Sequence, residues 1–195
     1  MFIKQRYSDA NIQYDEKGIR FMSHINDGIV ANGRRSELSS LYTLKQDTQQ
    51  YIEWETLIPD DWENDTGWCV IAQVHKVGGV GSGPNFAVEL TGDNMIIKVR
   101  DVKSQSHYIY QKPIIKGERL KFKAETRWTT LNNGYIRVYI NDILEAEYKG
   151  STNYEGATGG GYFKLGMYMG FPYLEDGILN EKAVQVKKRV IYHRI

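Results

Sequence analysis

The fold class follows from the stretch Tyr135-Ile136-Arg137-Val138-Tyr139-Ile140-Asn141-Asp142, in which apolar and polar side chains alternate. Successive side chains of a strand point to opposite faces, so the three aliphatic residues would share one face. Asn and Asp favour turns because their short side chains hydrogen-bond to the nearby backbone. The stretch therefore predicts a half-buried strand that ends at a turn.

The same alternation recurs in three other segments, Tyr51–Ile58, Asn85–Leu90 and Leu120–Glu125. The residues expected to share one face within each segment are Ile52, Trp54, Thr56 and Ile58; Phe86, Val88 and Leu90; and Leu120, Phe122 and Ala124. Turn-forming residues separate the segments, and no stretch has the periodicity of an amphipathic helix. We therefore predict an all-β fold, a jelly-roll sandwich of two antiparallel sheets.

Composition favours one domain that covers residues 1–195, because 41% of the residues are hydrophobic, enough for a sizeable core. The net charge of +1 gives no strongly basic surface, so nucleic acid and membranes are not expected partners. No apolar run approaches the ~18 residues of a membrane span. The sequence leaves the oligomeric state open.

We expect an extracellular or virion-associated protein, although the first six residues lack the apolar segment of a signal peptide. The given chain would then be a mature form, or would leave its cell by lysis. No metal and no other cofactor is expected, because His75, His107 and His193 lack the close spacing of a zinc site.

Three short segments place proton-handling side chains two residues apart on predicted strands: Arg34–Leu38, Gln73–His75 and Tyr162–Tyr168. The residues that would line one face are Arg35, Glu37, Gln73, His75, Tyr162, Lys164 and Tyr168. Phe163, Leu165 and Met167 would face the core. Two Gly-rich loops, 78–84 and 156–161, flank these strands and are predicted to be mobile rims of a groove.

These side chains are the parts needed for β-elimination from a uronate. The carboxylate must be neutralised so that the C5 proton becomes acidic, a base must remove that proton, and an acid must protonate the departing O4. An imidazole of pKa ~6.5 is available as a base at neutral pH, whereas a phenol of pKa ~10 needs nearby cations. Arg35 and Lys164 could supply such a field to Tyr168.

The three segments, in this order, resemble the motif blocks of the alginate lyases of polysaccharide lyase family 7. They also resemble the wider jelly-roll group that includes glucuronan lyases and heparin-lyase-I-like enzymes, and the stretch 127–142 is similar to a hairpin of that group. Two positions differ, because Ser39 replaces a second Arg and Gly170 replaces a polar residue. The substrate polymer is therefore left open.

The resemblance implies a concanavalin-like jelly roll that cleaves an acidic polysaccharide without a cofactor. It would make Arg35 and Gln73 the neutralisers of the carboxylate, with His75 and Tyr168 sharing the base and acid roles. The further residues expected to bind substrate are Glu37, Tyr162, Lys164, Arg137 and Tyr139.

A second hypothesis stays open at this point: a non-catalytic carbohydrate-binding domain of the same fold, such as part of a phage tail or capsule-recognising protein. The chain has 14 Tyr and 4 Trp, whose rings could hold a glycan without cutting it. Arg35 and Glu37 could equally be an ordinary ion pair on a strand. The complete set of acid, base and neutralising groups favours the enzyme.

Overall fold

The computed structural model describes residues 2–24, 27–30, 33–63, 67–169 and 188–195. These residues form fourteen strands, and the only helix among them is the short 3-10 helix η1 (Asp9–Asn11). Within the described ranges, no helix is long and apolar enough to cross a membrane. The same ranges hold no group of three or more His, Cys, Asp or Glu side chains arranged as metal ligands.

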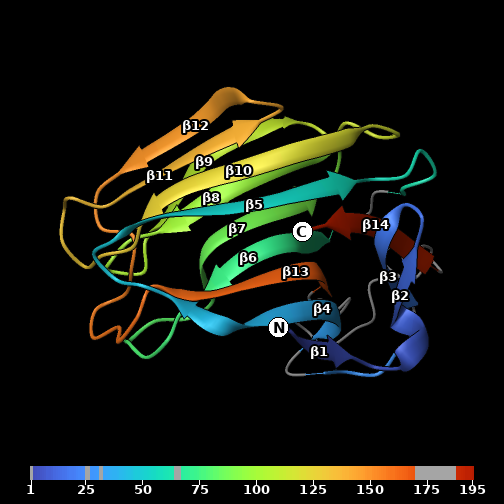
Figure 1. Cartoon of the computed structure of the whole chain (residues 1–195), viewed down its shortest axis with the longest axis horizontal. Coiled ribbons are helices and arrows are strands. Elements are labelled where there is room, and N and C mark those ends of the chain that lie inside the picture. Colours follow the sequence, from blue (N-terminus) through green and yellow to red (C-terminus); the bar gives the residue numbers. More distant parts are fainter. Residues whose placement is uncertain (1, 25–26, 31–32, 64–66, 170–187) are drawn as a thin grey trace.

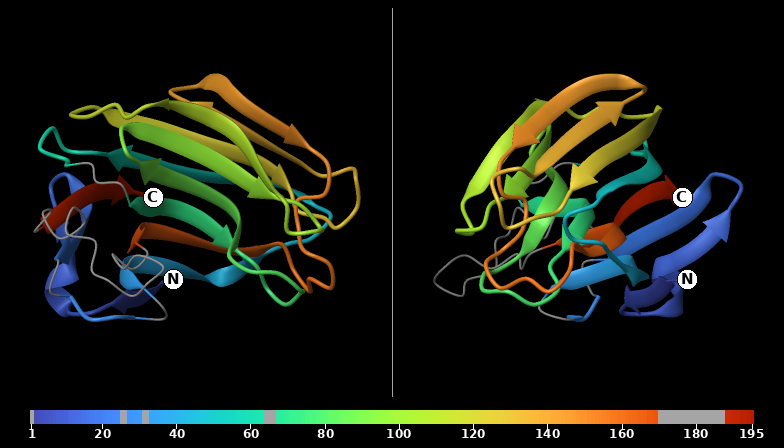
Figure 2. Two further views of the ribbon diagram at one scale, coloured as in Figure 1. Left: turned by 180° about the vertical axis from the view of Figure 1, so that it is seen from behind. Right: turned by 60° about the vertical axis from the view of Figure 1, so that its left-hand side comes forward.

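The strands form two seven-stranded sheets that lie on top of each other (Figures 1 and 2). The first sheet has the order β1 (Phe2–Arg6), β4 (Arg34–Leu44), β13 (Gly161–Met169), β6 (Trp68–His75), β7 (Pro84–Thr91), β8 (Asn94–Arg100) and β9 (Ser106–Pro113). The second has the order β12 (Ile143–Lys149), β11 (Tyr135–Ile140), β10 (Arg119–Arg127), β5 (Gln49–Leu57), β14 (Lys188–Arg194), β3 (Gly18–His24) and β2 (Ile12–Asp15). Neighbouring strands pair antiparallel, which confirms the predicted jelly-roll sandwich of two antiparallel sheets.

The alternating segments form strands β5, β7, β10 and β11, and the residues predicted to face inward are buried. In β6 and β7, however, the outward side chains are also largely buried, including Gln73 and Glu89. These two strands lie in the middle of the first sheet, where Gln73 donates to Glu37 and Glu89 pairs with Lys98. These contacts create a partly dry outer face.

The turn predicted at Asn141-Asp142 joins β11 to β12, with Ile140 paired to Ile143. Asn141 and Asp142 have φ angles of 52° and 65°. Two central residues with positive φ define the type I′ turn, whose twist matches that of the flanking strands. Asn and Asp tolerate this left-handed backbone better than other non-glycine residues, so the local sequence determines this hairpin.

The core joins the two sheets through aromatic side chains. Trp54 of β5 stacks on Phe122 of β10 with ring centroids 5.0 Å apart, and it lies 5.4 Å from Phe163 of β13. Leu165 and Met167 continue the buried side of β13. Because side chains alternate along a strand, this anchoring turns Tyr162 and Lys164 to the outer face of the first sheet.

Candidate functional site

Strand pairing brings the three motif segments together on adjacent strands β4, β13 and β6. Tyr162 pairs with His75, and Lys164 pairs with Gln73 on one side. On the other side, Tyr168 pairs with Arg35. We call the outward face of these three strands the motif face.

A bulge in β6 determines which other residues join the motif face. The pairing of β6 shifts between Val70 and Ala72 on both of its sides, so Ile71 and Ala72 both point into the core. Val70 then pairs with Tyr168 and faces outward, as does Trp68. A β-bulge inserts one residue and thereby reverses the alternation beyond it.

Glu37 is the centre of the motif face, although its side chain is only 2% exposed. Its Oε2 accepts hydrogen bonds from Arg35 Nη1 at 2.8 Å and from Lys164 Nζ at 2.6 Å. Its Oε1 accepts one from Gln73 Nε2 at 2.5 Å. A carboxylate only accepts, so it fixes the amide of Gln73 with its nitrogen toward Glu37. Glu37 therefore orients three of the predicted site residues.

The side chains of Glu37 and Lys164, both predicted to bind substrate, are only 2% exposed, and their contact with substrate stays a prediction. They form an ion pair below the surface. Burial lowers the pKa of the Lys164 ammonium, while the adjacent Glu37 carboxylate acts in the opposite direction. The field-setting role that the sequence suggested for Lys164 stays a prediction, and Glu37 orients the neighbouring side chains by accepting their hydrogen bonds.

Arg35 provides the accessible positive charge of this cluster, since its side chain is 10% exposed and that of Lys164 is 2%. With both basic groups protonated, Arg35, Lys164 and Glu37 carry a summed charge of +1. The guanidinium lies 4.0 Å from the ring centroid of Tyr168, and its Nη1 also donates to Gln5 Oε1 at 3.2 Å. The cluster can therefore attract a carboxylate.

His75 lies at the end of the motif face beside Tyr162, with ring centroids 5.5 Å apart. Burial lowers the pKa of the His75 imidazole, and the positive charges of Lys164 and Arg35 act in the same direction. The ring is therefore neutral at pH 7 and can accept a proton. Burial also raises the pKa of the Tyr162 phenol, which keeps that phenol protonated.

The two Gly-rich loops meet beyond this end of the motif face. Thr158 N donates to the Val77 carbonyl at 3.0 Å, and Val80 N donates to the Glu155 carbonyl at 2.8 Å. Gly78 also forms an isolated bridge with Ala157. The loops border the site as expected, but they are hydrogen-bonded to each other; their mobility stays a prediction.

Tyr168 is held by residues that the sequence did not single out. The edge of its ring meets Trp68 with centroids 5.3 Å apart, and a side chain at Gly33 would overlap the Tyr168 ring. Gly33 directly precedes the first motif segment, so its position in the sequence could have indicated that it lies next to the site. Trp68 offered none, because only the bulge in β6 turns it outward.

Gly166 lets β13 approach β4 next to Glu37. Its φ of +139° lies in a region that side chains rarely adopt. A Cβ atom there would overlap the Ser36 carbonyl oxygen and the Cα of Glu37. The glycine within the third segment is thus needed for the close packing of the site.

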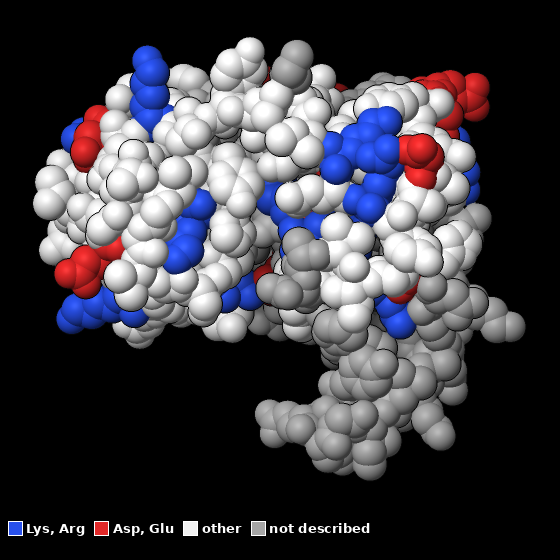
Figure 3. Space-filling view, turned by 90° about the horizontal axis from the view of Figure 1, so that it is seen from below, with Lys and Arg blue, Asp and Glu red and all other residues white. Residues whose placement is uncertain are grey.

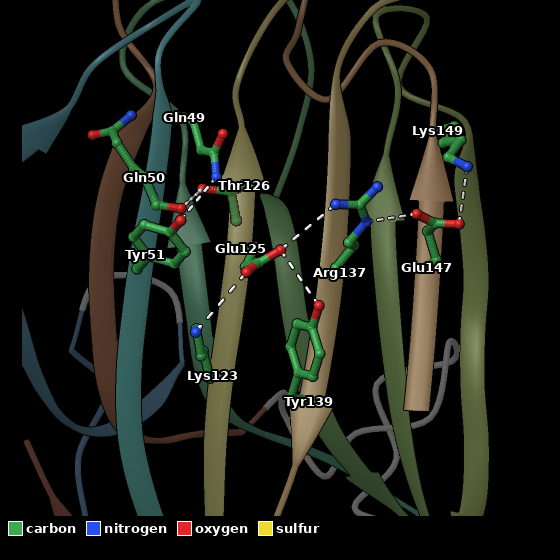
Figure 4. A network of polar contacts seen from close by, with 10 residues as sticks. All are labelled: Gln49, Gln50, Tyr51, Lys123, Glu125, Thr126, Arg137, Tyr139, Glu147 and Lys149. Carbon is green, nitrogen blue, oxygen red and sulfur yellow. Dashed lines mark hydrogen bonds and ion pairs between the residues drawn. The ribbon is translucent and has the colours of Figure 1, made fainter. Parts of the chain in front are cut away.

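The structure separates Arg137 and Tyr139 from the other predicted residues, which corrects their assignment to the same site (Figure 4). Both lie on β11 of the second sheet, where Ile136, Val138 and Ile140 face the core. Arg137 Nε donates to Glu147 Oε1 at 2.7 Å, and the Tyr139 hydroxyl donates to a Glu125 oxygen at 3.4 Å. They therefore belong to a network on the opposite outer face.

Figure 3 shows the molecule from below, the side on which β4 lies in Figure 1. In this view Lys and Arg atoms cover more of the surface than Asp and Glu atoms, and some of them lie within a central hollow. Ser39, at the position of the missing second Arg, is buried beside Lys164. Gly170, the other departure, lies outside the described residues.

Comparison with known proteins shows the family and the fold of the chain. A family model described as polysaccharide lyase matches residues 3–193. No curated protein sequence gives a significant match. Among solved structures, the chain is similar to an endo-β-1,4-glucuronan lyase from the fungus Trichoderma reesei, with 13% identity, a TM-score of 0.71 and coverage of 99% of this chain and 84% of that one.

Two alginate lyases have similar folds. The enzyme A1-II′, a member of polysaccharide lyase family 7, has 15% identity and a TM-score of 0.64, with coverage of 96% of this chain and 82% of that one. The enzyme from Pseudomonas aeruginosa has 18% identity and a TM-score of 0.61, with coverage of 96% and 84%. At these identities the likeness shows the jelly-roll fold, and the family model shows the family.

Proposed function

Because the chain belongs to the polysaccharide lyase family, we propose that it cleaves a uronate-containing polysaccharide by β-elimination. The observation that supports this proposal best is that Arg35, Gln73, His75 and Tyr168 all lie on the outward face of three adjacent strands. This set combines a net positive charge with a neutral imidazole and a phenol. A binding site would need no such pairing of proton-transfer groups.

In the proposed reaction, Arg35 and Gln73 neutralise the carboxylate of the uronate. Arg35 supplies charge, and Gln73 has a second N–H beyond the one that it donates to Glu37. Gln73 is only 2% exposed, so this N–H would meet the substrate at the floor of the site. Neutralising the carboxylate stabilises the negative charge that develops when C5 loses its proton.

His75 and Tyr168 share the proton transfers. One accepts the C5 proton, the bond between C4 and O4 breaks, and the electron pair of the C5–H bond forms the C4–C5 double bond. The other group gives a proton to the departing O4, so charge and atoms balance. The neutral state of His75 supports a role as base, and the Tyr168 ring lies 4.0 Å from the guanidinium that would bind the uronate carboxylate.

The polymer and the place of action are part of the proposal. The similar solved structures are a glucuronan lyase and an alginate lyase, and both polymers are acidic polysaccharides. The net positive charge of the Arg35 cluster supports a substrate of this class. Such a polymer would be met outside the cell, so we propose an extracellular or virion-associated protein. We expect no nucleic-acid or membrane partner.

The test is absorbance near 235 nm, which reports the unsaturated uronate product, across alginate, glucuronan, hyaluronan, heparin and bacterial capsules. On a polymer that is cleaved, Tyr168→Phe should lower kcat by ~10²-fold or more with similar substrate affinity, because only the hydroxyl is lost. Tyr139→Phe is the matched control on the opposite face and should stay fully active. A wild type that binds a glycan but releases no unsaturated product from any polymer would favour the binding-domain hypothesis.

A further inference from the structure

A pocket of about 500 Å³ lies directly beside Tyr168, over the outward faces of β6 to β9. This is within the usual range of about 300–1,000 Å³ for ligand pockets. The lining residues that matter for its chemistry are Trp68, Val70, Glu89, Lys98, Arg100 and Tyr108. No motif segment contributes to it except through Tyr168.

We propose that this pocket, which we call the β6–β9 pocket, is a sugar-binding subsite. It would hold a unit of the polymer chain next to the uronate that reacts at the motif face. The inference rests on the proposed function and adds to it the direction in which the polymer lies, across the strands of the first sheet.

The floor of the pocket is continuous with the motif face. Val70 pairs with Tyr168 on one side and with Glu89 on the other, so these three outward residues form a row across β13, β6 and β7. The distance from β13 to β9 spans four strand spacings, about 19 Å at ~4.8 Å each. A polymer chain bound at Tyr168 can therefore continue into the pocket without leaving the sheet.

The lining has both surfaces that a pyranose ring needs. Trp68 and Tyr108 are 39% and 67% exposed, so their rings are available to stack on sugar C–H groups. Lys98 Nζ lies 2.5 Å from Glu89 Oε1, with the two side chains 14% and 8% exposed. This partly dry ion pair offers donors and acceptors to sugar hydroxyls.

Charge favours an acidic polymer as the occupant. Arg100 is fixed by the hydrogen bond from its Nη1 to the Pro84 carbonyl at 2.8 Å. With Lys98 and Glu89, it gives the pocket a summed charge of +1, which equals the sum at the Arg35 cluster. Two positive clusters on one face suit a chain that carries carboxylates on successive sugars.

Tyr108 provides the cleanest test, because its ring is mostly exposed and it has no part in the proposed chemistry. Tyr108→Ala should raise KM for a long polymer about fivefold or more and change kcat less than twofold. Tyr108→Phe keeps the ring and should restore the wild-type KM. The matched control is Tyr51→Ala, because Tyr51 is a 54% exposed tyrosine on the second sheet. This substitution should leave KM unchanged.

The dependence of KM on substrate length separates loss of a subsite from a general loss of stability. The effect of Tyr108→Ala should grow with oligosaccharide length and vanish for chains too short to reach the pocket. An unchanged KM on the polymer, or the same rise at every chain length, would overturn the subsite while the wild type stays an active lyase. A wild type without product on any polymer would overturn the proposed function itself, and the subsite with it.

Discussion

Replacing Glu37 with Gln should destabilise the protein strongly, because the substitution leaves a buried ammonium without its carboxylate. Lys164 Nζ lies 2.6 Å from Glu37 Oε2, and each side chain is 2% exposed. Removing one partner of such a buried pair typically costs about 3–5 kcal/mol. For a chain of this size, ~2–4 °C per kcal/mol gives a Tm lower by about 6–20 °C.

The double variant Glu37→Gln/Lys164→Met separates charge from packing. The second change removes the ammonium that Glu37→Gln leaves buried without a partner. The double variant should therefore be more stable than the sum of the two single changes predicts. The assay is urea unfolding of all variants, followed by far-ultraviolet circular dichroism. Glu147→Gln serves as the control, since Glu147 pairs with Arg137 at 2.7 Å on an exposed face and should change stability little.

Activity should follow the same logic. Without the carboxylate, Arg35 and Gln73 lose the common acceptor that orients them, so kcat of folded Glu37→Gln should fall as well. A cost to stability below about 1 kcal/mol, or single changes that add exactly in the double variant, would refute the view that Glu37 anchors the site.

Three further predictions follow from the charges and burial. Because burial lowers the pKa of His75, the imidazole stays neutral down to a pH below ~6.5. The value of kcat/KM should therefore be highest at neutral to mildly alkaline pH and should fall with acidification only below pH ~6.5. A sharp acidic optimum would argue against His75 as the base. Arg35→Ala should raise KM and lower kcat together and weaken the inhibition by salt, since the guanidinium binds the carboxylate of the bound substrate and interacts more strongly with the negative charge that develops in the transition state. A change in KM alone would contradict this role. His193 is fully buried beside Thr56, and burial lowers the pKa of its imidazole to about 3. In the unfolded chain the imidazole binds a proton at pH ~6.5, so the free energy of unfolding should decline as pH falls from ~6.5 toward 3. In urea unfolding at several pH values, His193→Gln should make this decline less steep.

Much of the fold could be predicted from local sequence. Alternation marks β5, β10 and β11 because a strand has a side-chain period of two, and the inward residues Trp54, Phe122 and Val138 are buried as expected. The Asn141-Asp142 turn is equally local, since its positive φ angles suit those residue types. The three motif segments were also readable, because each keeps its polar residues on one side of one strand.

Other features depended on which strands pair. Arg137 and Tyr139 alternate with apolar residues just as Gln73 and His75 do, yet they lie on the second sheet. The sequence could not show this, because the local pattern of a strand does not specify which strand it pairs with. The bulge at Ile71 reverses the alternation of β6 and turns Trp68 outward, which the sequence does not mark.

The sequence by itself determined which residues could do chemistry and which side of each strand they occupy. Only the tertiary structure decided that Glu37 is a buried anchor, because its burial comes from Arg35 on its own strand, Lys164 on β13 and Gln73 on β6. Side-chain direction is a property of the local backbone, so a short segment encodes it. Burial and charge pairing arise from strands far apart in the chain, so they exist only once those strands are side by side.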